Sequence, residues 1–179
     1  MTISAFRLSC LAFLVSLWGS VALAQEAGLP GGASSLREVY GDWVVNCAMT
    51  GAGAEARKLC AMSQEQQDGE TGQRVIALEL QASAEGGTAT LVLPFGLDLA
   101  SGAVLQIDEG ERGAPLAFRT CLPAGCLIST PIAPEMLAAL RGGTALRVHA
   151  KADGGRDALF SLSLNGFGGA FDRTLALAG

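Results

Sequence analysis

The sequence contains a single histidine among its 179 residues, and only 6% of its residues are aromatic. A hydrolase triad needs a histidine base, so a site of this kind would have to use His149. His149 alternates with Arg147 and Lys151, which is typical of the solvent face of a strand and brings two cations that disfavour imidazole protonation. An anionic partner could contact this basic stripe, but a solvated face is the simpler interpretation. No Gly-x-Ser-x-Gly motif occurs, so we expect no catalytic residue.

The chain also lacks an excess of positive charge, since 12 Lys and Arg stand against 17 Asp and Glu. An acidic chain with scattered basic residues is a poor binder of nucleic acid, which we exclude as a partner. After residue 24 no apolar run approaches the roughly 20 residues that a transmembrane helix needs. The segment Gly166-Phe-Gly168-Gly169 has no following lysine, so we interpret it as a tight turn between strands rather than a phosphate loop.

The N-terminus has the pattern of a secretory signal. Arg7 supplies an early positive charge, and the apolar run at residues 8–18 is followed by the small-x-small sequence Ala22-Leu23-Ala24. The run is too short for a membrane anchor. Cys10 lies near its start rather than after it, which disfavours a lipoprotein. We expect cleavage after Ala24 and a periplasmic or secreted mature chain.

Four cysteines follow the signal: Cys47, Cys60, Cys121 and Cys126. An even number of cysteines in an exported chain predicts disulfides. Three connectivities are open, and the sequential one, Cys47–Cys60 with Cys121–Cys126, closes the shortest loops. A redox site would favour C-x-x-C at a helix N-terminus, and the spacings do not match those of zinc fingers or ribbons. We therefore expect no metal and no cofactor.

The 24 glycines and few aromatic residues favour short strands joined by tight turns. Residues 25–36 have no period and predict a flexible leader, and residues 37–179 predict one β domain. Residues 134–141 predict one short helix that begins at Pro134 and is ended by Gly142-Gly143. Nine or ten strands with this helix predict an antiparallel β-sandwich or flattened barrel. The expected strands lie at residues 39–47, 59–64, 74–82, 88–93, 103–108, 116–121, 127–130, 146–151, 160–164 and 171–177.

Carboxylates occur in two groups, Asp108, Glu109 and Glu111 in one and Asp153 and Asp157 in the other. Neither group has the alternating pattern of a calcium loop, which favours exposed acids in turns. The alternative is a periplasmic hydrolase that acts on carbohydrate or peptide through the first group, since glycosidases use paired carboxylates.

The strongest local motif is Tyr40-Gly41-Asp42-Trp43, a turn that enters a strand. We interpret it as a structural signature that anchors packing through Trp43, with a ligand platform as the alternative. Four phenylalanines are expected in the core: Phe118, Phe160, Phe167 and Phe171.

Five segments, in order, carry a family resemblance, and they include all four cysteines. They are YGDWVVNC at 40–47, LCAMSQ at 59–64, LPFGLDLASGAVLQID at 93–108, FRTCLPAGCLISTPIAPEMLAALRGG at 118–143 and SLSLNGFGGAFDRTLAL at 161–177. In these segments the chain resembles the invasion-associated locus B family of exported bacterial proteins, with Tyr40 in place of a usual phenylalanine.

The resemblance implies a periplasmic or envelope-exposed, β-rich protein with two disulfides. The family takes its name from a locus linked to host erythrocyte invasion, and it offers no catalytic residues to carry over. We therefore expect a non-enzymatic protein that binds an unidentified protein or envelope partner.

Overall fold

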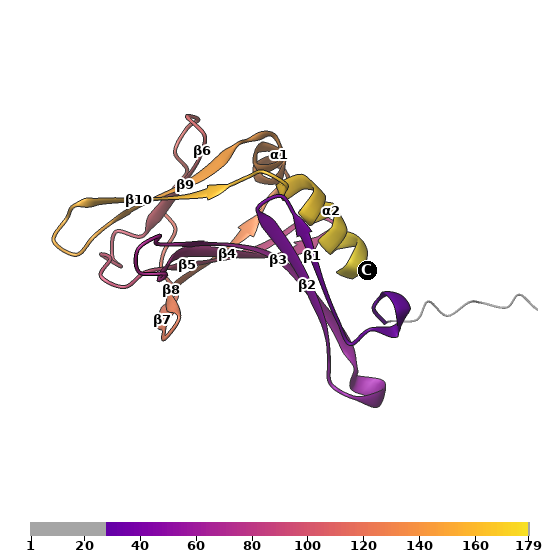
Figure 1. Cartoon of the computed structure of the whole chain (residues 1–179). Helices are drawn as coiled ribbons and strands as arrows, with labels where there is room; N and C mark the ends of the chain where they lie inside the picture. Colours follow the sequence, from indigo (N-terminus) through magenta and orange to yellow (C-terminus); the bar gives the residue numbers. More distant parts are fainter. Residues whose placement is uncertain (1–27, 179) are drawn as a thin grey trace, which may run out of the picture.

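The computed structural model describes residues 28–178. The expected signal at residues 1–24 and the start of the expected leader, residues 25–27, lie outside the described residues. The fold consists of two facing antiparallel sheets and two helices (Figure 1). The large sheet has the strand order β1-β2-β3-β4-β5-β8-β7, and the small sheet has the order β10-β9-β6. The predicted antiparallel, sandwich-like β fold is confirmed.

The strands of the large sheet are β1 (Ser35–Tyr40), β2 (Trp43–Thr50), β3 (Arg57–Gln67), β4 (Arg74–Ser83), β5 (Gly86–Leu93), β7 (Thr120–Leu122) and β8 (Gly125–Ile132). The small sheet contains β6 (Ala103–Ile107), β9 (Ala145–Lys151) and β10 (Asp157–Ser163). The helices are α1 (Pro134–Gly142) and α2 (Phe167–Ala178), and short 3-10 turns lie at Pro30–Gly32 and Gly53–Glu55.

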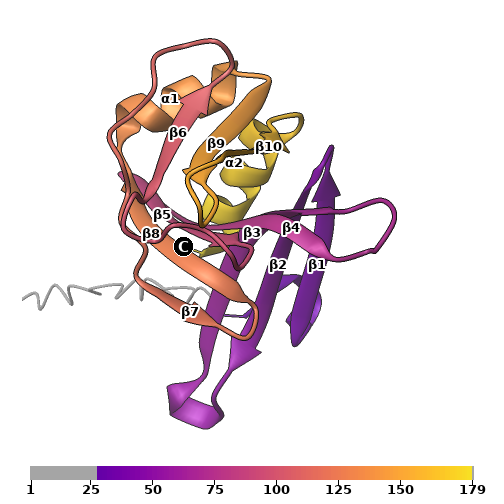
Figure 2. The same cartoon turned by 90° about the vertical axis from the view of Figure 1, so that its left-hand side faces the viewer.

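Helix α2 and the small sheet cover the same inner face of the large sheet (Figures 1 and 2). α2 contacts β1 to β4, and β10 contacts β3 and β4. Burial of apolar side chains between these layers is the main favourable term in folding. The largest fully buried side chains are Trp43, Phe167, Phe171, Met62, Ile76, Leu78, Leu80, Leu91, Leu93, Ile128, Leu140 and Leu162.

Strand alternation follows the sequence pattern. In β4 the buried residues are Ile76, Leu78 and Leu80, and in β9 they alternate with Arg147, His149 and Lys151. Of the four phenylalanines expected in the core, Phe167 and Phe171 are fully buried, while Phe118 and Phe160 pack against the core and are partly exposed.

The predicted helix is confirmed as α1. Pro134 occupies its first turn, where a missing N–H costs nothing, and Glu135 and Arg141 lie at the ends that suit their charges. Leu140 is the residue that this helix buries.

The predicted closing strand at residues 171–177 is wrong, because this segment belongs to α2. The buried positions of α2 include Phe167, Phe171, Thr174 and Leu177, which recur at the spacing of one helix face. The interpretation of Gly166-Phe-Gly168-Gly169 as a turn between strands fails with it, since Gly166 precedes the helix and the other three residues begin it. Residues 28–178 therefore contain two α-helices, not one.

The expected strand at residues 39–47 is divided by a turn at Gly41 and Asp42, which separates β1 from β2. The folded domain also begins before the expected boundary at residue 37: Leu29 is buried, and Ser35 and Leu36 pair with β2. The expected strand at residues 116–121 is reduced to Thr120–Leu122 and an isolated bridge from Leu116.

Both disulfides link directly opposed residues of adjacent strands, as the sequential pairing predicts. Cys47 of β2 is bonded to Cys60 of β3, with Cα atoms 4.1 Å apart. Cys121 of β7 is bonded to Cys126 of β8, with Cα atoms 3.9 Å apart. Within residues 28–178, neither helix has the length and apolarity to span a bilayer.

Candidate functional site

The turn at Tyr40, Gly41, Asp42 and Trp43 docks against the segment that joins β10 to α2. Trp43 is fully buried, and its Nε1 donates a hydrogen bond to Ser163 O at 3.0 Å. Its ring meets the Phe167 ring edge-on, with centroids 5.2 Å apart. Such aromatic pairs stabilise by about 0.5–1.5 kcal/mol beyond the area they bury.

Polar contacts complete this junction. Asp42 accepts a hydrogen bond from Ser163 Oγ at 2.6 Å, and its N–H donates to Asn165 O at 3.1 Å. The buried side chain of Gln64 donates to Asp42 O and Ser163 O and accepts from Ser163 N–H. A fully bonded amide in a core fixes the relative position of the segments it joins. The four signature residues therefore have a packing and positioning role here.

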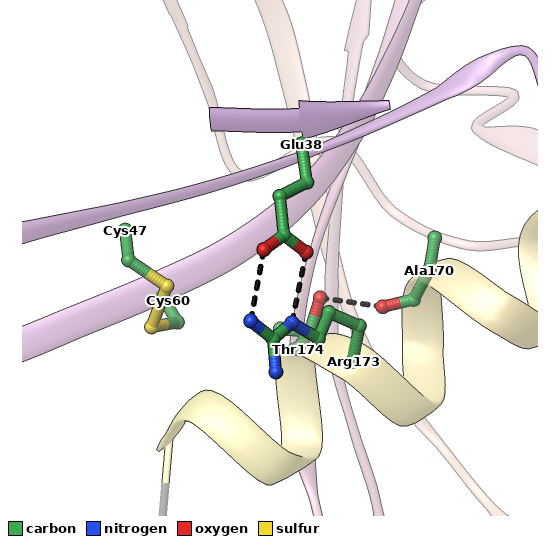
Figure 3. Close-up of a disulfide and its surroundings, with 6 residues drawn as sticks. All are labelled: Glu38, Cys47, Cys60, Ala170, Arg173 and Thr174. Carbon is green, nitrogen blue, oxygen red and sulfur yellow. Dashed lines mark hydrogen bonds and ion pairs between the residues drawn. A yellow bond between two sulfur atoms is a disulfide. The ribbon is translucent and has the colours of Figure 1, made fainter. Parts of the chain in front are cut away.

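Helix α2 is also held to β1 by an ion pair beside the Cys47–Cys60 disulfide (Figure 3). Arg173 donates two hydrogen bonds of 2.8 Å to the Glu38 carboxylate, which also accepts from the Tyr40 hydroxyl. The hydrogen bond from Arg173, and then that from Tyr40, lower the pKa of Glu38. The bond to Glu38 raises the pKa of Tyr40. These interactions link the two ends of the described chain.

The acids considered for catalysis have separate partners. Asp108 has a left-handed backbone, φ 50°, and its carboxylate accepts from Thr144 and from Ala145 N–H. The side-chain hydrogen bond from Thr144 is the largest cause of a lowered pKa for Asp108, which is the opposite of what a general acid requires. Glu109 pairs with Arg147 at 2.6 Å. Glu111 lines a groove described below.

We expect the Asp108→Asn variant to have a lower unfolding free energy than the wild type near neutral pH. On acidification, the variant should lose less unfolding free energy than the wild type does. Asparagine tolerates the left-handed backbone, so the change removes mainly the charge. Because folding lowers this pKa, the contribution of Asp108 is complete above its ordinary value of 3.8 and is lost as the pH falls through the folded value.

Urea denaturation near neutral pH and at about pH 3 measures this difference. Asp153→Asn is the matched control, because the Asp153 carboxylate makes no hydrogen bond to a described residue. If Asp108→Asn and the wild type lost the same unfolding free energy on acidification, the stabilising role of the Asp108 carboxylate would be contradicted.

The other sequence candidates are also engaged in local contacts. Asp157 pairs with Lys151 at 2.9 Å, whereas the Asp153 backbone N–H donates to Gly96 O. His149 is half-buried rather than solvated, and its Nε2 lies 2.7 Å from Gln106 Oε1. Within residues 28–178, no three His, Cys, Asp or Glu side chains converge in a way that could hold a metal ion.

An apolar groove lies where α1 faces the edge strand β6 and the loop at residues 108–118. It consists of two adjoining hollows, with cavity volumes of about 560 Å³ and 200 Å³, that share Leu105, Gly113, Ala133 and Met136. Glu111 and Glu135 lie on its rim, both exposed and without an ion pair to any described residue. We call this the α1–β6 groove, and its other lining residues are Ile107, Gly110, Ala114, Leu116, Thr130, Pro131, Ile132 and Ala139.

A separate hollow of about 630 Å³ lies across β1 to β4 beside Cys47–Cys60. Its lining includes Arg37, Lys58 and Glu79, so it combines charges of both signs. The α1–β6 groove differs because its floor is apolar and both charged residues in its lining are acidic. No sequence pattern predicts this groove, since its walls come from two stretches, residues 105–116 and 130–139, that only the folded structure brings together.

The fold and these sites define a β-rich domain with two hairpin disulfides and an apolar groove between α1 and the edge strand β6 of the small sheet. The sequence model of the family described as Invasion associated locus B (IalB) protein matches residues 43–175. The chain belongs to the invasion-associated locus B family.

Known relatives support this assignment across the chain. An invasion protein B homolog of Brucella abortus is 43% identical over 174 residues, which covers 96% of this chain and 97% of the relative. Invasion protein B of Bartonella bacilliformis is 32% identical over 181 residues, which covers 98% of this chain and 94% of the relative. The crystal structure of invasion associated protein b from Bartonella henselae has a TM-score of 0.70 at 31% identity, covering 79% of this chain and 96% of that one.

Proposed function

We propose that this protein is exported, is not an enzyme, and acts by binding a partner in the α1–β6 groove. The signal pattern at the N-terminus and the two disulfides support export. The relatives are named as invasion proteins and their names state no reaction, which supports a role in host interaction or at the cell envelope. No observation favours the hydrolase alternative, because Asp108 and Glu109 are held by other residues.

The groove is the single observation that carries the binding function. Its volume lies in the range of sites that hold small ligands or anchor side chains. Met136 contributes to both hollows, and a methionine side chain adapts to apolar partners of different shape. An apolar floor of this kind is suited to the anchor side chain of a partner protein.

The charge of the rim identifies the kind of partner. Glu111 and Glu135 present two carboxylates without a counter-ion from the described residues, beside the apolar floor. A partner segment with a lysine or arginine next to a large apolar side chain would satisfy both features. The proposed occupant of the α1–β6 groove is such a basic, apolar segment of a partner protein.

A random heptapeptide library displayed on phage, selected on the oxidised mature protein, tests this proposal. We expect enriched peptides to combine an apolar residue with an adjacent Lys or Arg. In the double variant Glu111→Lys/Glu135→Lys, their affinity should fall about tenfold or more, because two attractive pairs become repulsive.

The control is Glu55→Lys/Glu70→Lys, which makes the same change in charge at two exposed residues that do not line the groove, and it should leave affinity unchanged. Enrichment of acidic peptides, or binding that is indifferent to the groove variant, would refute the proposal.

A further inference from the structure

The outer face of the small sheet contains a second hollow, separated from the α1–β6 groove by β6 itself. Leu105 and Ile107 of β6 line the groove, whereas Val104 faces this hollow. Side chains on successive residues of a strand point to opposite faces, so one strand separates the two sites. The hollow has a cavity volume of about 160 Å³, and its lining includes Ser101, Val104, Arg112, His149, Lys151 and Asp157.

Two separate elements bring basic side chains to this hollow. His149 and Lys151 project from β9, and Val104 of β6 is the direct partner of His149. Arg112 comes from the loop after β6 and forms no ion pair with any described residue. In a chain whose net charge is −5, this local clustering of cations is a departure from the average surface.

The single acid in the lining can be displaced. Asp157 pairs with Lys151 at 2.9 Å, but its side chain is 92% exposed while that of Lys151 is 50% exposed. Exposed ion pairs contribute only about 0–1 kcal/mol, so an incoming anion can replace this carboxylate at little cost. On the same face, Arg147 pairs with Glu109, whose side chain is 84% exposed.

His149 gives the hollow a hydrogen-bonding group that responds to pH. Gln106 Oε1 can only accept, so the contact at 2.7 Å places a hydrogen on His149 Nε2 and leaves Nδ1 free to gain one. Burial first, and then the charges of Arg112 and Arg147, lower the pKa of His149, while Asp157 opposes them. An anion beside Nδ1 would favour the protonated ring.

We propose that this hollow, the Arg112 pocket, binds a tetrahedral oxyanion through Arg112, Lys151 and His149. The anion is a sulfate or phosphate group, either free in solution or carried as an ester on a sugar. Arginine provides a planar pair of donors that matches such oxygens, and lysine adds a point charge. Anion binding and protonation of His149 are then linked, so each strengthens the other.

His149 is the only histidine of the chain, so its imidazole proton signals are assigned without ambiguity. We expect its NMR titration in the oxidised mature protein to give a pKa about half a unit or more higher in sodium sulfate than in sodium chloride of equal ionic strength. Arg112→Gln should abolish this difference between the two salts. Arg156→Gln, a neighbouring exposed arginine that does not line the pocket, should retain it.

Titration with glucose 6-sulfate, in parallel with inorganic sulfate, shows whether the pocket prefers a sugar-borne group or the free ion. A lower half-saturating concentration for the ester indicates a sugar-borne group, and the reverse order indicates the free ion. Equal His149 pKa values in chloride, sulfate and ester would overturn the proposal. A sulfate-dependent shift that survives Arg112→Gln would overturn it as well.

Discussion

Replacing Gly166 with alanine is expected to destabilise the protein by about 3 kcal/mol or more, because no side chain fits there. Gly166 has φ +87°, and a Cβ atom would lie 2.0 Å from the backbone oxygen of Tyr40. Either the backbone must shift or the Tyr40–Trp43 turn must separate from the start of α2. The change therefore acts on the junction that joins the two ends of the described chain.

Gly168→Ala provides a matched control two residues away. A Cβ there meets only the flexible Arg141 side chain, at 3.6 Å, and Gly168 lies inside α2. Alanine in a helix should be neutral or stabilising, by up to about 1 kcal/mol. Urea denaturation of both variants measures the contrast, and equal stability of the two would contradict the role assigned to Gly166.

Removing the Cys47–Cys60 disulfide as Cys47→Ala/Cys60→Ala should cost about 3 kcal/mol of unfolding free energy in the chain-entropy account. The bond closes the β2–β3 hairpin with a sequence separation of 13, next to the contacts of α2. Removing Cys121–Cys126, with a separation of 5, should cost less, about 2 kcal/mol.

Chemical denaturation of the two double variants beside the oxidised wild type measures both losses. The variant without Cys47–Cys60 should lose more unfolding free energy than the variant without Cys121–Cys126. Equal midpoints for the wild type and Cys47→Ala/Cys60→Ala would show that the bond contributes no stability.

Much of the β architecture could be predicted because its signal is local. Alternation at Ile76, Leu78 and Leu80 reflects a strand with one buried face, and Pro134 with Gly142 limits a helix whatever surrounds it. Helix α2 was missed although Phe167, Phe171 and Thr174 have helical spacing, since glycines at its start suggested a turn.

The sites depend on long-range packing that no local pattern contains. Gln64 occupies an inward position of β3, but its role becomes visible only when the topology places Ser163 and Asp42 beside it. The α1–β6 groove and the Arg112 pocket likewise need loop residues such as Glu111 and Arg112 to fall on opposite sides of β6.

Methyl NMR of methionine-labelled mature protein can detect directly whether a partner segment binds in the α1–β6 groove. Titration with a groove-selected basic peptide should shift the Met136 methyl signal, since Met136 lines both hollows. The Met62 signal should stay unchanged, because Met62 is fully buried in the large sheet. A saturating titration that leaves Met136 unmoved would contradict the claim.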